Sequence, residues 1–539
     1  MVCLVGCIGL GLSLRFANLD LKVYSYDEAI TSLRISGHTW QEVVTQMGPQ
    51  TNESPFLRVD QFLQRYQSVD PTNGVGATVV GLAQEESQLT PLYFLLVRLW
   101  AQWVGDSVAA VRGFSALLSV VLLWALYRLS CRLFRDSLTP LMSVAIASAS
   151  PFLLLYAQDA RPYTLLSLAV ILSAEALLTA FTRGTVHAWG LYGLSVLLGL
   201  YSHLLFALVL AGHGLYVSFL SLKKRTLQPV GMFAGSMGLA VVAFSPWLWV
   251  MQRYRAPVAD KLDQTFLSWQ SLPGTLFALI RITARTILDT HWSGGIIRIS
   301  SQVWPNSLVQ GVATLAILGL IGYACYWLWS RTALSVWGIV LLPALVTLMV
   351  LMSKGAIPER YLMPYFLAIH IAVAYCLAQK LLTAPVRCRF WLSVTALVLI
   401  AGLCSGGVST QTPVWSIKFP SSTAQNGAIA AVINQTETPC VIVYQPLDRQ
   451  AFGKAGRDRL GRMLSLSHGL KPSVALELIN DPQQVTFPAG YSDYFIYRPS
   501  SAIRETIQTD QGYQLLSVDG IAQDELLIVS THPVAASTE

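Results

Sequence analysis

Charged residues are scarce in this chain of 539 residues, because only 12% are Asp, Glu, Lys or Arg while 53% are hydrophobic. Soluble globular proteins carry roughly 25% charged residues, so the composition excludes an ordinary soluble enzyme. Long basic runs are also missing, and the formal net charge is only +7. A nucleic acid is therefore not expected as a partner.

Other familiar signals are absent as well. The eight cysteines show neither a disulfide framework nor the spacing of a zinc site, and Cys440 alone lies in the polar tail. The first apolar run, Met1 to Phe16, lacks the basic start and the small-residue cleavage site of a signal peptide, so we interpret it as an uncleaved span. The tail contains no glycine-rich phosphate loop and no nucleophile elbow.

Long apolar runs are what the chain does contain. Runs of about 20 residues, enough to cross a hydrocarbon core of roughly 30 Å, recur from the N-terminus to about residue 409. They predict a polytopic α-helical membrane protein with about eleven spans. These lie near residues 1–17, 111–127, 139–156, 163–181, 188–205, 206–222, 229–249, 305–329, 333–352, 362–381 and 391–408.

Basic residues in alternate short loops set the expected orientation in the plasma membrane. By the positive-inside rule, the N-terminus and these loops are cytoplasmic, whereas loops 18–110 and 250–304 and the tail face outward. We predict a transmembrane domain over residues 1–409, which includes both long loops, and an extracytoplasmic α/β domain over residues 410–539. The basic loop residues are Arg128, Arg132, Arg135, Arg183, Lys223, Lys224, Arg225, Arg331, Lys380, Arg387 and Arg389.

Local patterns predict elements in the outer segments. Ser25-x-x-Glu28 and Thr39-x-x-Glu42 fit capping boxes, which indicates two short helices separated near Gly37. The apolar segments Pro91–Trp103 and Phe266–Leu288 carry arginines and are expected at the membrane surface. In the tail, the pattern predicts strands at Cys440–Tyr444, Tyr494–Tyr497 and Leu526–Val529, and helices at 424–433 and 501–509.

Asp27 and Glu28 are the candidate catalytic residues, since a carboxylate pair at a membrane boundary is costly unless it is solvated or used. Neighbouring helical residues point about 100° apart, so the two are not expected to act on one atom, and Asp27 is our choice as general base. The alternative is structural, because Glu28 completes a capping box with Ser25 and an acidic first turn suits the helix dipole.

Two predicted spans begin with an arginine on the outer side. Arg161 lies in Gln158-Asp159-Ala160-Arg161-Pro162-Tyr163, and Arg360 lies in Pro358-Glu359-Arg360-Tyr361, with Lys354 shortly before it. A guanidinium group suits phosphate oxygens through paired donors, so these residues could clamp a lipid phosphate. Snorkelling to the headgroups and binding of ordinary anionic lipids remain alternatives.

Further candidates are weaker. His203 could orient a phosphate or a carboxylate, although a lone histidine is more often a hydrogen-bonded structural residue. Glu85 and Glu86 are candidate ligands for a divalent cation, but no histidine lies at ligand spacing, and a solvated loop is the better interpretation. We predict no required cofactor.

In this order, the motifs resemble the GT-C superfamily of polyprenyl-phosphate-dependent glycosyltransferases, especially bacterial relatives of the protein O-mannosyltransferases and the lipid A aminoarabinose transferases. The resemblance covers about residues 1–410. Relatives often have His-Pro-Pro or Glu-Lys-Pro where this chain has Leu89-Thr90-Pro91, so a ligand expected there is absent or supplied by Glu85 or Glu86. The motifs are Tyr26-Asp27-Glu28, Thr90-Pro91-Leu92-Tyr93, the segment 158–163 and Arg360-Tyr361-Leu362-Met363-Pro364.

The resemblance implies a catalytic acid, here Asp27, and a donor phosphate site at Arg161 and Arg360. We expect Lys354 to assist there and Asp159, Tyr163, His203, Glu359 and Tyr361 to support the site. The expected activity is transfer of a hexose or pentose from a polyprenyl-phosphate donor to a lipid, glycan or protein acceptor outside the cell. A secondary transporter or lipid-linked-sugar flippase is the alternative, although transporters usually place ionisable groups near mid-bilayer. An inactive scaffold on the same fold also remains open.

Overall fold

The structure, a computed structural model, describes the chain except for residues 48–55, 255–271, 290–302, 354–357, 384, 416–422, 446–456 and 531–539. The chain forms two compact units. Unit 1 comprises Met1–Leu21, Leu82–Leu96 and Ala109–Ile417, and unit 2 comprises Lys22–Gly81, Val97–Val108 and Lys418–Glu539.

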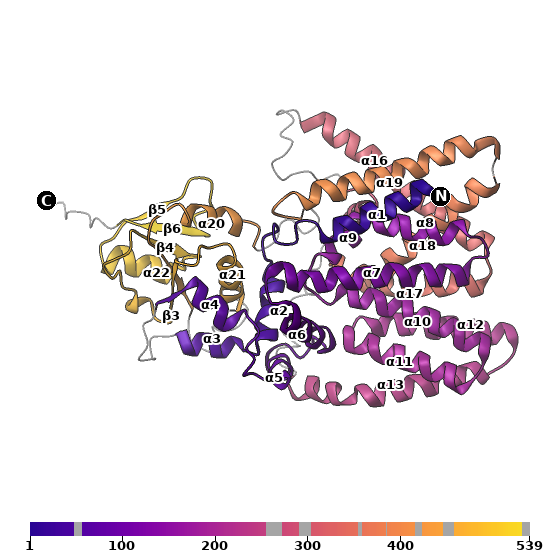
Figure 1. Cartoon of the computed structure of the whole chain (residues 1–539), viewed down its shortest axis with the longest axis horizontal. Helices are drawn as coiled ribbons and strands as arrows, with labels where there is room; N and C mark the ends of the chain where they lie inside the picture. The colour runs from indigo at the N-terminus through magenta and orange to yellow at the C-terminus, as the bar shows by residue number, and fades with distance from the viewer. Residues whose placement is uncertain are drawn as a thin grey trace. The chain divides into compact units, whose positions relative to one another are not determined.

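Unit 1 is made of long helices (Figure 1). Helix α18 is the central element of unit 1. Of the most apolar stretch of the span Glu359–Thr383, 89% is buried, and α18 packs against α8, α10, α16, α17 and α19. The helices are α1 (Val2–Phe16), α7 (Val108–Leu133), α8 (Leu138–Ala149), α9 (Pro151–Ala157), α10 (Tyr163–Arg183), α11 (Val186–Ser202), α12 (Phe206–Lys224), α13 (Gln228–Arg253), α15 (Leu272–Arg285), α16 (Val303–Arg331), α17 (Leu334–Ser353), the 3₁₀ turns η1 (Glu359–Leu362) and η2 (Pro385–Arg387), α18 (Met363–Thr383) and α19 (Cys388–Thr410).

The prediction of a polytopic α-helical membrane protein is confirmed. Among the described residues, eight helices are long and apolar enough to cross a membrane, or nine if α8 and α9, which meet at a bend of 68°, form one span. Each predicted span corresponds to a helix, but α1 and α11 have only 15 and 17 residues. The predicted number of about eleven spans is consistent with these helices but is not confirmed by their lengths, since only eight or nine of them among the described residues are long and apolar enough.

Unit 2 is an α/β structure whose segments come from distant parts of the chain. Its six-stranded sheet has the order β1-β3-β2-β4-β6-β5, in which β2 pairs in parallel with β3 and β4, and the outer pairs are antiparallel. The first loop supplies α2 (Tyr26–Ser36), α3 (Trp40–Met47), β1 (Phe56–Arg58) and α4 (Val59–Tyr66), while α5 (Val75–Glu85) and α6 (Leu92–Val104) have residues in both units. The tail supplies α20 (Asn426–Ile433), β2 (Pro439–Tyr444), α21 (Arg457–Ser467), β3 (Ala475–Ile479), the turn η4 (Pro482–Gln484), β4 (Asp493–Tyr497), α22 (Ser501–Glu505), the turn η5 (Thr506–Asp510), β5 (Leu515–Ser517) and β6 (Leu526–Val529).

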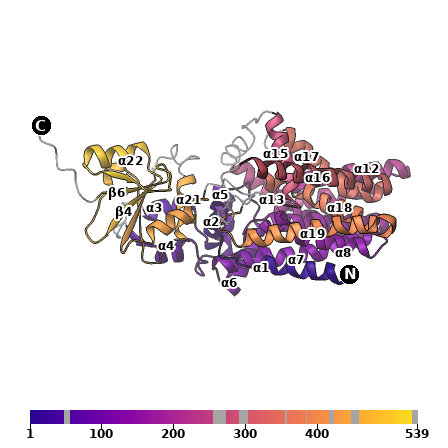
Figure 2. The ribbon, with the colours of Figure 1, turned by 90° about the horizontal axis from the view of Figure 1, so that it is seen from above.

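Alternation along the strands builds a core on each face of this sheet. Val441, Leu476 and Phe495 face α2, α3, α4, α20 and α21, whereas Cys440 and Ile496 face α22 (Figure 2). Residues 22–81 thus share a core with the tail. The compact units therefore differ from the predicted division at residue 409, because the helices of the first loop bury their apolar sides against the sheet.

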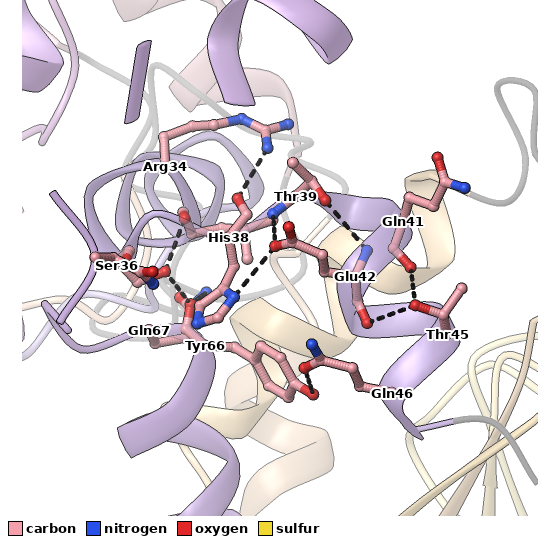
Figure 3. A network of polar contacts seen from close by, with 12 residues as sticks. Arg34, Ser36, His38, Thr39, Gln41, Glu42, Thr45, Gln46, Tyr66 and Gln67 are labelled. Atoms are coloured by element: carbon pink, nitrogen blue, oxygen red, sulfur yellow. Dashed lines mark hydrogen bonds and ion pairs between the residues drawn. The ribbon is translucent and has the colours of Figure 1, made fainter. Parts of the chain in front are cut away.

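Both predicted capping boxes are present in unit 2. Ser25 and Glu28 cap α2, which ends at Gly37 with φ +93°. At the start of α3, the backbone N–H of Thr39 donates to the carboxylate of Glu42 at 2.9 Å, and the backbone N–H of Glu42 donates to the hydroxyl oxygen of Thr39 at 3.1 Å (Figure 3). These local patterns place the two helices as expected, because a cap depends on residues three apart in sequence.

The three strands predicted in the tail are also confirmed, within one residue at their ends. The helix predicted at 424–433 is α20, which begins two residues later, and the helix predicted at 501–509 is α22 followed by the π-helical turn η5. The pattern missed β1, β3 and β5. It also did not foresee that Arg98 of α6 is fully buried and donates to the carbonyl oxygens of Ile35, Asp70 and Asn73 in unit 2.

Candidate functional site

The turn between α9 and α10 carries three of the predicted site residues. Asp159, Arg161 and Tyr163 are 2%, 5% and 4% exposed. The backbone N–H of Arg161 donates to the carbonyl oxygen of Asp159 at 2.7 Å, which closes a tight turn before α10. Arg161 also lies over the Phe94 ring, with its guanidinium carbon 5.9 Å from the ring centre.

Gln158 holds this turn against the first helix. Its side-chain amide donates to the carbonyl oxygens of Leu14 and Ala17 at 2.8 Å each, where α1 ends and the last carbonyl groups lack the N–H groups of a following turn. Gln158 belongs to the sequence motif 158–163, but the motif alone did not indicate a role for it. Its position beside Asp159 was the available signal.

Arg15 holds the other end of α9. Pro151 begins this helix and has no N–H to offer the carbonyl oxygen of Ala147, so the end of α8 needs another donor. The guanidinium of Arg15 donates to the carbonyl oxygens of Ala147 and Ser148 at 3.1 and 2.9 Å. Arg15 of α1 therefore caps the end of α8, and Gln158, which follows α9, caps the end of α1.

The second arginine motif forms η1, directly before the central helix α18. Glu359, Arg360 and Tyr361 are all half-buried there. The guanidinium carbon of Arg360 lies 5.6 Å from the ring centre of Tyr361, its neighbour in sequence. A short turn thus presents a cation and an aromatic ring at the start of α18.

His203 connects the two arginine motifs. It follows α11, and its ring centre lies 5.6 Å from that of Tyr163 and 6.0 Å from that of Tyr361. The positive charges of Arg161 and Arg360 both act on this ring. The structure therefore brings together Arg161, Tyr163, His203, Arg360 and Tyr361, which lie far apart in the sequence; we call these five residues the arginine cluster.

The hydrogen bonding of His203 defines which ring nitrogen is available. Nδ1 accepts the backbone N–H of Leu205 at 3.1 Å. In the neutral ring the proton is then on Nε2. The bond from Leu205 agrees with the structural interpretation of His203, and the functional interpretation would use the N–H of Nε2.

Two further groups lie next to the arginine cluster. Tyr156 of α9 packs against Tyr163 with ring centres 5.3 Å apart, and the charges of Glu359, Asp159 and Arg360 act on its hydroxyl. Arg285 forms a buried ion pair of 3.3 Å with Asp289 and also interacts with Glu359. No sequence pattern pointed to Tyr156, because an aromatic residue in an apolar span is ordinary.

Asp27 and Glu28 belong to unit 2, in the first turn of α2. The Glu28 side chain is buried, and its Oε2 accepts from the N–H and the hydroxyl of Ser25 at 3.0 and 2.9 Å. This carboxylate is thus engaged in the capping box, as the structural alternative requires. Asp27 is half-buried.

The remaining candidates are Lys354, Glu85 and Glu86. Lys354 lies outside the described residues. Glu86 is buried and Glu85 half-buried. In the part of the chain that the structure describes, no group of three or more His, Cys, Asp or Glu side chains could hold a metal ion, so Glu85 and Glu86 form no such group with described neighbours.

Comparison with known proteins bears out the resemblance to membrane glycosyltransferases. Residues 88–250 match the family described as dolichyl-phosphate-mannose-protein mannosyltransferase. This range contains Asp159, Arg161, Tyr163 and His203, but neither Asp27 nor Arg360. A comparison with curated proteins returns no match.

Two solved structures are similar to this chain. The apo state of ArnT from Cupriavidus metallidurans has 13% identity and a TM-score of 0.46 over 82% of this chain and 87% of that one. ArnT from the same organism bound to undecaprenyl phosphate has 14% identity and a TM-score of 0.46 over 97% of each chain.

Proposed function

We propose that this protein is an integral membrane glycosyltransferase that transfers a sugar from a polyprenyl-phosphate donor to an acceptor on the extracytoplasmic side. The observation that carries the proposal is the arginine cluster, in which Arg161 and Arg360 converge on His203. The match of residues 88–250 to a mannosyltransferase family supports it.

In the proposed reaction, the cluster binds the donor phosphate. A phosphate that leaves a sugar gains negative charge, so fixed cations beside it stabilise the transition state more than the ground state. Arg161 and Arg360 supply that charge, and Nε2 of His203 donates one further hydrogen bond. The aromatic rings of Tyr163 and Tyr361 hold the imidazole in place.

Asp27 acts as the general base in this proposal. Its carboxylate takes the proton of the acceptor hydroxyl while the acceptor oxygen bonds to the anomeric carbon. The bond between that carbon and the phosphate oxygen breaks, and its electron pair leaves with the polyprenyl phosphate. A single displacement inverts the configuration of the anomeric carbon. One carboxylate is sufficient for this transfer, whereas glycoside hydrolases need two opposed carboxyl groups. Glu28 keeps its place in the capping box and supports α2.

We place the protein in the plasma membrane with its N-terminus in the cytoplasm and unit 2 outside. The support is the distribution of basic residues at alternate helix ends and short loops, such as Arg183 at the end of α10 and Lys223 and Lys224 at the end of α12. Polyprenyl-phosphate sugar and membrane lipid are the expected partners.

The decisive experiment compares Asp27→Asn with Glu28→Gln. Purified full-length protein is incubated with undecaprenyl phosphates that carry a labelled hexose or pentose, and with an envelope extract as acceptor source. Asp27→Asn should lower the transfer rate by about 10²-fold or more. Glu28→Gln retains the acceptor that a capping box needs and should stay near the parental rate.

Either of two results would contradict this assignment. A folded Asp27→Asn protein that transfers at the parental rate has a different base, and equal losses in both variants would point to Glu28. In liposomes, movement of the labelled lipid across the bilayer without any glycosyl product would favour the flippase.

A second comparison tests the phosphate site. Arg161→Gln and Arg360→Gln should each weaken donor binding by about tenfold or more, since hydrogen bonds to charged groups contribute roughly 1.5–3 kcal/mol. Arg183→Gln is the control, because Arg183 lies at the far end of the helix that Tyr163 begins and is exposed. The measurement is the KM for the donor, and equal KM values in all variants would remove the arginine cluster from the proposal.

A further inference from the structure

The residues just before Asp27 are packed on helix α21 of the tail, within unit 2. Tyr26 lies against bare backbone, because a Cβ at Gly461 would be only 2.2 Å from Cε2 of the Tyr26 ring. The ring of Tyr24 lies 4.3 Å from that of His468, measured between centres. Tyr24 and Tyr26, the residues on either side of Ser25, thus both pack against the tail.

A buried line of hydrogen bonds connects the sheet to the same segment. The Tyr497 hydroxyl of β4 donates to Oδ1 of Asn426 at 2.9 Å, and the Asn426 amide donates to the hydroxyl oxygen of Ser465 at 2.9 Å. Ser465 in turn donates to the backbone carbonyl oxygen of Tyr24. All these side chains are at most 3% exposed, so the bonds are shielded from water and their loss is costly.

From Tyr24 the constraint passes directly into α2. The Tyr24 hydroxyl is 2.6 Å from that of Ser32 on the same helix, and Ser25 forms the cap. Helix α2 begins at Tyr26, so Asp27 is its second residue. The position of Asp27 therefore depends on a backbone segment whose contacts with the tail include the hydrogen bond from Ser465, the ring of His468 and the backbone at Gly461.

We propose that Ser465, Asn426 and Gly461 of the tail are positioning residues for Asp27, and that positioning this carboxylate is a function of the C-terminal part of the chain. This inference rests on the proposed function, because it needs Asp27 to be the base. A group held in a productive geometry loses much of its effect when it is displaced by as little as about 1 Å.

The experiment compares Ser465→Ala with Ser467→Ala in the full-length protein. Both serines are in α21 and at most 2% exposed, but the Ser467 hydroxyl bonds within the helix, to the carbonyl oxygen of Leu464 at 2.8 Å. With labelled undecaprenyl-phosphate sugar, Ser465→Ala should lower kcat about tenfold without changing the KM for the donor. Ser467→Ala should keep both values, and Ser465→Thr, which retains the hydroxyl, should recover most of the lost rate.

Gly461→Ala provides a second and independent variant. Its new Cβ would displace the Tyr26 ring, whereas Gly76→Ala, also in unit 2, has nothing within 4 Å of the added atom. We expect a fall in kcat for Gly461→Ala alone. For both positioning variants, the acidic limb of the kcat–pH profile should shift, which a smaller folded fraction would not cause.

The outcomes separate this inference from the proposed function. If Asp27→Asn is inactive while Ser465→Ala and Gly461→Ala match their controls, the positioning role is wrong and the function stands. Equal losses in Ser465→Ala and Ser467→Ala, with an unchanged pH profile, would also overturn the positioning role. If Asp27→Asn transfers normally, the proposed function itself fails.

Discussion

At the scale of single residues, Glu477 is the most unusual titratable group of unit 2. It lies in the middle of β3, is 2% exposed, and its Oε2 has no hydrogen-bond partner among the described residues. By register it is opposite Ile442, and it shares a sheet face with Cys440. Burial raises the pKa of Glu477 from 4.5 to about 8, so the carboxyl is largely protonated at neutral pH.

This pKa shift predicts a pH-dependent stability of unit 2. Between pH 4.5 and about 8 the folded state binds more protons than the unfolded state, so stability falls as pH rises through this range. Glu477→Gln imitates the protonated carboxyl and should remove this fall, with a higher melting temperature than the parent at pH 8. Thermal unfolding between pH 5 and 9 provides the measurement.

Glu437→Gln is the control for this prediction. Glu437 is exposed and lies just before β2, so its substitution should leave the stability profile unchanged. A parental profile in Glu477→Gln would show that the Glu477 carboxyl does not contribute to the pH dependence.

At the scale of elements, α1 and α9 define the place of Arg161 by capping in both directions. Arg15 supplies donors for the end of α8, and Gln158 supplies donors for the end of α1. Helices α1 and α8 also approach closely, because a Cβ at Gly11 would lie 2.6 Å from the carbonyl oxygen of Ser148 in α8. The turn with Arg161 begins directly after Gln158, so a shift of α9 would also move Arg161 and disturb the arginine cluster.

Arg15→Met is therefore expected to destabilise unit 1 by about 1–3 kcal/mol, since two buried carbonyl groups lose their donors. It should also raise the KM for the donor, although Arg15 does not belong to the cluster. The measurements are thermal unfolding in detergent and donor kinetics. Ser13→Ala on the same helix is the control, as the Ser13 hydroxyl is exposed and bonds to Gly9 within α1. If Arg15→Met matches Ser13→Ala in both, α9 does not depend on this cap.

At the scale of the whole molecule, unit 2 is built from the first loop and the tail together. Strand β1 pairs with β3 in an antiparallel register, and α2 packs against α21. Their shared core includes Leu33 and Phe62 from the loop and Leu460 and Phe495 from the tail. Neither segment can bury its apolar residues without the other.

Truncation after Ile417 is therefore expected to unfold residues 22–81 and abolish transfer, even though Asp27 remains in the chain. Limited proteolysis should then cut rapidly within this range, where the full-length protein resists. Truncation after Ser530 leaves every strand in place and should keep both resistance and activity. A protease-resistant first loop in the shorter protein would contradict the shared core.

Much of this architecture could be predicted because the signals are local. The helices of unit 1, the caps at Ser25 and Thr39 and the strands at Cys440 and Tyr494 depend on residues within a few positions of each other. The pattern missed β1, since a strand of three residues carries almost no periodicity. It also could not reveal Gln158 or Ser465, whose polar side chains gain their roles from distant backbone carbonyl groups.

The sequence by itself determined that this chain is a membrane protein, where its helices lie and which residues were candidates, because hydropathy and capping act over one or two turns. Only the tertiary structure decided that Arg161 and Arg360, about 200 residues apart, both lie near enough to His203 for their charges to act on its ring, and that residues 22–81 fold with the tail. The physical reason is that such contacts come from the packing of buried surfaces between segments far apart in the chain, and no local pattern records which segments will meet.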